Sequence, residues 1–63
     1  MYLVQLNGMT VYHDESYSKA VHVYNEKLDN AKRGDFVTIW FIKDMGMSIY
    51  KDKNATLLAG VRT

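Results

Sequence analysis

The side chains that could carry out chemistry are few: two histidines, three serines and seven carboxylates in 63 residues. A nucleophile needs a base beside it, and none of Ser16, Ser18 and Ser48 stands in a catalytic motif. His22 lies outside the apolar stripe of a predicted helix, and His13 ends a predicted strand, so both are expected to be exposed or hydrogen-bonded rather than general bases. Because so short a chain also leaves little room for a substrate pocket, we predict that the protein is not an enzyme.

Metal and cofactor sites are not predicted either. His13, Asp14 and Glu15 are adjacent in the chain, but at a strand-to-helix junction their side chains fan apart and match neither a zinc nor a calcium loop. The chain has no cysteine, so it can form neither disulfides nor thiolate zinc sites. Its four glycines are scattered singly and form no phosphate-binding loop. We therefore expect no metal, no cofactor and no small-molecule substrate.

Aromatic and basic residues raise the alternative of single-stranded nucleic-acid binding, in which bases stack on an exposed sheet. The candidate side chains are Tyr2, Tyr12, Phe36, Trp40 and Tyr50, with Lys43, Lys51, Lys53 and Arg62 around them. However, the net charge is only +1 and acids are interleaved with the bases, for example at Asp35, Asp44 and Asp52. Mixed charges weaken the positive potential that would attract phosphates. Nucleic acid is therefore the alternative partner and not the primary prediction.

The elements that must position these side chains begin with a hairpin in "MYLVQLNGMTVYH". Asn7-Gly8 separates two β-prone runs, and both residues tolerate the positive φ of a type I′ turn. With these two as the loop, one face carries the pairs Leu6 with Met9 and Val4 with Val11, and the other carries Gln5 with Thr10 and Leu3 with Tyr12. The first face is the predicted core face.

A helix of about 17 residues is predicted next, since apolar residues recur every three or four positions. The stripe consists of Tyr17, Ala20, Val21, Tyr24, Leu28 and Ala31. Asp14 or Ser16 is suited to cap the first turn, and Lys32-Arg33-Gly34 is suited to end the helix.

The remaining chain predicts two or three strands. Residues 36–42 form a strongly apolar strand, a turn follows at 44–46, and residues 47–51 are expected to return antiparallel. Residues 55–61 are a last strand or, less favoured, a short helical piece. The prediction is a single α+β domain over residues 1–63, with one helix packed on one face of a mainly antiparallel sheet.

The strand at 36–42 is apolar on both faces, yet one helix covers only one of them. We expect the uncovered face to be an interface, made by Phe36, Trp40 and Ile42 together with Met45 and Met47 at the following turn. If the helix covers the Trp40 side instead, the interface consists of Val37, Ile39 and Phe41. A further alternative is that the last segment folds across the open face and closes a small barrel.

Oligomerisation is expected on size alone. A chain of this length buries only about 60% of its unfolded surface, and no disulfide reinforces it. We predict a homo-oligomer built through the open sheet face or a sheet edge, most simply a twofold dimer, that acts by protein–protein contact. No apolar run approaches the roughly 18 residues of a membrane span, so a cytoplasmic protein is expected.

In size, and in a hairpin followed by "HDESYSKAVHVYNEKL" and a strong strand, the chain resembles small open reading frames of bacteriophages and their bacterial hosts. The resemblance is architectural and assigns no residue roles. It implies either an accessory or structural piece of a virion, which would make the protein virion-associated, or a small inhibitor that docks on a host protein.

Overall fold

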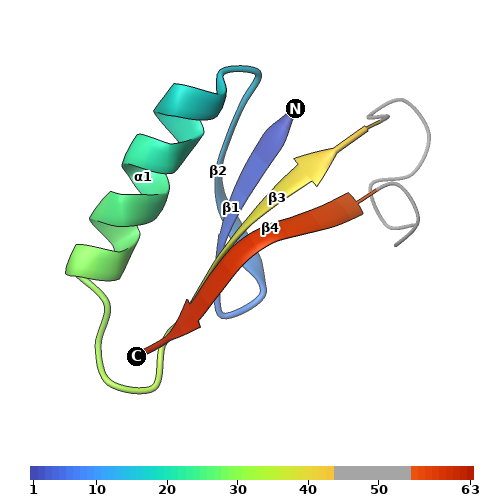
Figure 1. Cartoon of the computed structure of the whole chain (residues 1–63). Helices are drawn as coiled ribbons and strands as arrows, with labels where there is room; N and C mark the ends of the chain where they lie inside the picture. The colour runs from blue at the N-terminus through green and yellow to red at the C-terminus, as the bar shows by residue number, and fades with distance from the viewer. Residues whose placement is uncertain (44–54) are drawn as a thin grey trace.

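A four-stranded antiparallel sheet carries one helix in the computed structural model, which describes residues 1–43 and 55–63 (Figure 1). The elements in chain order are β1 (Tyr2–Leu6), β2 (Met9–Asp14), α1 (Tyr17–Asp29), β3 (Phe36–Ile42) and β4 (Ala55–Arg62). The strand order is β2-β1-β3-β4. The predicted α+β class, with a hairpin, a helix and further antiparallel strands, is confirmed. The strand predicted at 47–51 lies outside the described residues.

The turn between β1 and β2 is built as the Asn-Gly pair predicts. Asn7 and Gly8 have φ values of 53° and 85°, the positive region that a type I′ turn requires. Asn7 also joins this turn to the start of β3. Its backbone N–H donates to the carbonyl of Phe36 at 2.7 Å, and its Oδ1 accepts from the Phe36 N–H at 2.8 Å. The hairpin tip is therefore fixed to the strand beside it.

The predicted hairpin register is correct near the turn and wrong beyond it. Leu6 pairs with Met9 and Gln5 with Thr10, but an irregularity between Val4 and Gln5 then places Val4 opposite Tyr12. The extra residue is Val11, which is exposed, while Tyr12 packs against the core. A bulge of this kind shifts every later side chain to the opposite face. Met9, expected in the core, is also exposed, at the start of β2, which is an edge strand of the described sheet.

The helix is shorter than predicted, with 13 residues. Ser16 caps its start, and its hydroxyl accepts from the Lys19 N–H at 3.4 Å. It ends at Asn30, whose backbone N–H and side-chain amide both donate to the carbonyl of Glu26. Gly34, expected to end the helix, has a φ of 94° in the turn that leads into β3 instead. The asparagine cap stops the helix one turn before the glycine.

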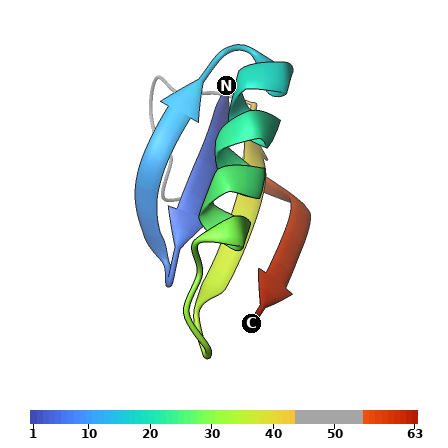
Figure 2. The same ribbon diagram turned by 90° about the vertical axis from the view of Figure 1, so that its left-hand side faces the viewer.

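The core lies between α1 and three of the strands, with α1 crossing β1, β2 and β3 on one side of the sheet (Figure 2). Its buried residues are Val4, Ala20, Tyr24, Val37 and Ile39. The small side chain of Ala20 lets the helix approach the sheet closely, and burial raises the pKa of Tyr24. The helix therefore covers the Val37 and Ile39 face of β3.

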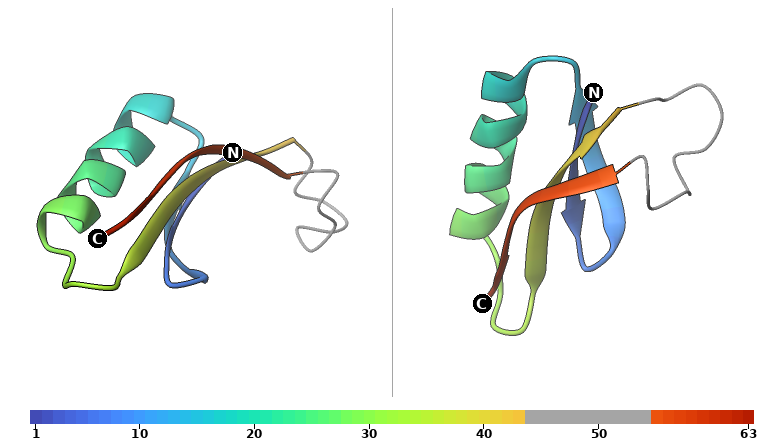
Figure 3. Two further views of the ribbon diagram at one scale, coloured as in Figure 1. Left: turned by 60° about the horizontal axis from the view of Figure 1, so that its bottom comes forward. Right: turned by 45° about the vertical axis from the view of Figure 1, so that its right-hand side comes forward.

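The last segment is a strand, not a helical piece. Residues 55–62 pair with β3 over its whole length, from Ile42 opposite Ala55 to Phe36 opposite Arg62. Thr63 continues the attachment, because its N–H donates to the carbonyl of Asp35 at 2.8 Å. β4 extends the curved sheet at its edge (Figure 3), so the predicted alternative of a last segment folded across the open face is not observed.

No helix in the described ranges, 1–43 and 55–63, is long and apolar enough to cross a membrane.

Candidate interaction surface

The outer face is the side of the sheet away from α1. Because the helix covers the Val37 and Ile39 side, the condition under which those two residues and Phe41 would form an interface is not met. The ladder places Phe36, Trp40 and Ile42 on the outer face, as the primary prediction assumed. Met45 and Met47 lie outside the described residues.

Several side chains of the outer face are already buried within the single chain. The indole N–H of Trp40 donates to the Thr38 hydroxyl at 2.9 Å, so the ring leans along its own strand. Thr38 and Leu3 are buried, and Ile42 is only 2% exposed. Trp40 and Phe36 are half-buried. Of the three predicted interface residues in the described chain, Phe36 and Trp40 have surface to offer a partner, and Ile42 has almost none.

Phe36 is held by β4. Two atoms of its ring lie 3.5 Å from the position that a Cβ on Gly60 would occupy, so the missing side chain makes room for the ring. The Arg62 guanidinium lies 5.0 Å from the ring centroid, within the range of a cation–π contact. Arg62 also donates to the carbonyl of Gly34 at 3.4 Å. These contacts fix the C-terminal half of β4 to β3.

Exposed large apolar residues lie on β4 and also, in Met9 and Val11, on β2. Leu57 is 49% exposed, and Leu58 and Val61 are each 43% exposed. Leu57 shares the outer face with Trp40, Val61 shares the opposite face with Val37, and Leu58 is the extra residue at a register shift. We call these three residues the β4 surface. Sequence reasoning missed them, although the seven-residue run "ATLLAGV" contains no charge and was itself a signal.

Several of the groups considered for catalysis have hydrogen-bond or ion-pair partners near the start of α1, and Ser48 lies outside the described residues. The Tyr12 hydroxyl donates to Asp14 at 2.7 Å, and the other oxygen of Asp14 accepts from the Ser16 N–H at 2.8 Å. The bond from Tyr12 and the one from Ser16 lower the pKa of Asp14, and the same contact with Asp14 raises the pKa of Tyr12. Ser16 caps α1, and exposed His22 lies 3.7 Å from Glu26. This junction organises the start of the helix.

A metal site is not formed by the described part of the chain, where no three histidine or carboxylate side chains gather. His13 pairs with Leu3 in the β1–β2 ladder, and its side chain is exposed.

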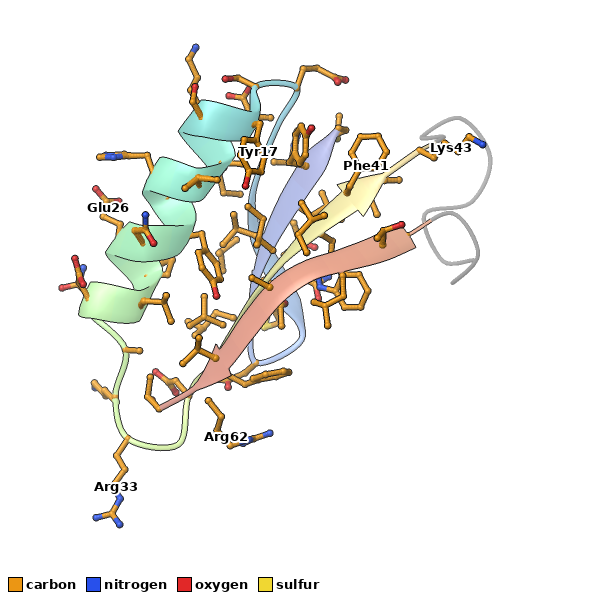
Figure 4. All side chains as sticks on the ribbon, viewed as in Figure 1. Tyr17, Glu26, Arg33, Phe41, Lys43 and Arg62 are labelled. Atoms are coloured by element: carbon orange, nitrogen blue, oxygen red, sulfur yellow. The ribbon has the colours of Figure 1, made fainter. Side chains whose placement is uncertain are left out.

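The predicted aromatic platform is divided between the two sides of the sheet. Tyr2 packs against Tyr17 and Phe41 with ring centroids 5.2 Å apart in each pair, and this cluster lies on the helix side. Figure 4 shows Tyr17 and Phe41 at one end of the molecule, and Arg33 and Arg62 at the other. Phe36 and Trp40 remain on the outer face. Tyr50, Lys51 and Lys53 lie outside the described residues.

Comparisons with known proteins give no match: no family model, no curated protein and no solved structure is similar to this chain. The function is therefore inferred from the geometry above.

Proposed function

We propose that the protein is a small, non-enzymatic protein-interaction module that works as a homo-oligomer. The observation that carries this proposal is the β4 surface: three large apolar side chains, each more than two-fifths exposed, on the last strand of the sheet. Single exposed apolar residues are ordinary, but these three lie on one edge strand, with Leu57 on one face of the sheet and Val61 on the other. A partner bound along that edge would cover apolar groups on both faces.

The size of the chain supports the same conclusion. In the described residues the core consists of one helix on three strands, and its fully buried large side chains are Val4 and Val37. Cores this small supply little net stability, and the chain has no cysteine to reinforce it. Burial of the β4 surface between chains would add apolar area that a single chain lacks.

The biological setting follows from the resemblance to small bacteriophage and bacterial reading frames. We propose either a structural or accessory component of a virion or an inhibitor that docks on a host protein. An oligomer suits both roles, since it presents the same surface more than once. The protein would act in the cytoplasm or as part of the virion.

A second candidate function is single-stranded nucleic-acid binding on the outer face. The observation in its favour is the pairing of two half-buried aromatic rings, Phe36 and Trp40, with Arg62 beside the first. Titration of Trp40 fluorescence with a mixed oligonucleotide at low and high salt tests it, because stacking quenches the indole and phosphate contacts fade with salt. Trp40 already donates to Thr38, and Arg62 already covers Phe36, which favours protein interaction.

Light scattering on a sizing column, over a range of protein concentrations, tests the proposed function. A single chain has a mass of 7.3 kDa. We expect a larger mass that rises toward a dimer as concentration increases. A constant mass of one chain up to the highest concentration would overturn self-association.

A further inference from the structure

We infer that a second copy of the chain pairs its β4 with β4 in antiparallel orientation, so that the two sheets join into one. The inference rests on the proposed self-association and assigns it a location and a geometry.

The first argument comes from the backbone of β4. Among the described residues β4 pairs only with β3, and no other strand of that part of the chain lies along its second side, where the backbone N–H and C=O groups of an edge strand point outward. The partner that matches such an edge is another extended strand. Both ends of β4 are already ordered: Ala55 pairs with Ile42, and the Gly34 N–H donates to the Thr63 carbonyl at 2.9 Å. An edge ordered in advance loses little entropy when a strand is added.

The second argument comes from the side chains of the same edge. No residue from Ala55 to Val61 is charged, and Thr56 is the one polar side chain among them. The β4 surface presents Leu57 on the outer face and Val61 on the opposite face. An added strand therefore meets apolar groups above and below the plane of the sheet. A second β4 supplies the same pattern and satisfies both faces at once.

Charge selects the antiparallel orientation. Arg62 is the one charged residue of β4. In a parallel pair the two Arg62 side chains would lie next to each other, whereas in an antiparallel pair they lie at opposite ends, up to roughly 23 Å apart at about 3.3 Å per residue. That separation exceeds the screening length of about 8 Å at physiological salt. Antiparallel pairing about a twofold axis also makes the contact closed and identical for both copies.

The opposite edge of the sheet is less suited to pairing. β2 has six residues, and its last two are His13 and Asp14. Asp14 is engaged with Tyr12 and Ser16, and charge or polar side chains on an edge discourage strand addition.

A pair of matched substitutions tests the location. Leu58→Glu places a charge on β4, and Val11→Glu places one on β2. Both residues are extra residues at a register shift on an edge strand, and their exposed fractions are 43% and 41%. We expect Leu58→Glu to raise the dimer dissociation constant at least about tenfold, measured by light scattering, and Val11→Glu to leave it unchanged. Circular dichroism is the control that checks whether both variants are folded.

The outcomes separate this inference from the proposed function. If the parent self-associates and both variants keep its mass, self-association stands and the β4 location is wrong. If only Val11→Glu dissociates, the interface lies at β2, and the inference is again overturned. If the parent is a monomer at every concentration, the proposed function fails and the inference fails with it.

Cysteine crosslinking tests the antiparallel geometry, because the parent has no cysteine of its own. Around a twofold axis at the middle of β4, Leu58→Cys or Ala59→Cys brings two thiols within disulfide distance, whereas Ala55→Cys alone leaves them at opposite ends. A mixture of Ala55→Cys with Arg62→Cys is expected to form the mixed disulfide under mild oxidation. Strong homodimer crosslinking by Ala55→Cys alone would contradict antiparallel pairing.

Discussion

The helix-covered side of the sheet and strand β4 are built from similar residues but reach opposite degrees of burial. Val4 and Val37 are completely buried under α1, while Leu57, Leu58 and Val61 on β4 keep between two-fifths and one-half of their surface exposed. The helix contacts β1, β2 and β3, and β4 is held chiefly through β3. The difference indicates that burial within one chain is concentrated on the helix-covered side, and β4 is where the proposed partner copy would bind.

Truncation of a core residue should give the largest effect. Ile39 is 3% exposed and lies in the cluster beneath α1. We expect Ile39→Ala to lower the free energy of unfolding by about 2–5 kcal/mol, because it removes buried methyl groups and leaves a cavity. Urea unfolding followed by circular dichroism measures the change.

Leu57→Ala is the control on β4, since it also shortens a large apolar side chain. At protein concentrations where the chain is monomeric, the loss should stay below about 0.5 kcal/mol because Leu57 is half exposed. Equal losses at the two positions would show that β4 is part of the single-chain core and would remove the contrast between the regions.

Gly60→Ala should give a smaller loss, of about 1 kcal/mol, because an added Cβ would press against side chains of β3. A Cβ there would lie 3.1 Å from Cγ2 of Thr38, which is tighter than ordinary packing. Thr38 is buried and accepts from the Trp40 indole, so it has little freedom to move aside. Urea unfolding again gives the change in free energy.

Thr38→Ser sharpens the test because it removes Cγ2 and keeps the hydroxyl that Trp40 uses. In a double-mutant cycle, Gly60→Ala should cost less in the Thr38→Ser background than in the parent. An additive cycle would mean that the Thr38 methyl does not limit the approach of the two strands.

Local chemistry made several elements predictable from sequence. The Asn7-Gly8 turn follows from the φ preferences of its two residues, and Ser16 has the residue type of a helix cap. The bulge at Val11 was not predictable in the same way. The bulge lets the Tyr12 ring pack against the core while its hydroxyl donates to Asp14. Only the assembled fold provides these contacts.

The candidate surface was predictable only in part. Phe36 and Trp40 were assigned to one face by alternation, but both faces of β3 are apolar, so the pattern alone could not say which one α1 covers. The exposure of Leu57 and Leu58 depends on β4 being the last strand of the sheet. Since Ala and Leu favour helices, the pairing with β3 decides the strand conformation, and pairing is a tertiary effect.

The smallest expected effect is a loss of stability in acid at the corner where β4 ends. The Asp35 carboxylate accepts from the Lys32 N–H at 2.9 Å and from the Asn7 side chain at 3.1 Å, and these bonds hold its pKa below the ordinary value of 3.8. The carbonyl of the same residue binds Thr63 after β4. Because the folded state favours the ionised form, its contribution is complete above pH 3.8 and disappears as the pH falls through the lower, folded value.

Urea unfolding between pH 7 and pH 2 measures this loss, and Asp35→Asn isolates it. The variant should be less stable than the parent at pH 7, and the difference should shrink in acid, where the parent loses the same charge. Asp14, whose pKa is also lowered, lies at the β2 side and remains in the variant, so part of the acid dependence should persist. If the stability gap between parent and variant were the same at every pH, the Asp35 charge would not contribute to holding the corner beside β4.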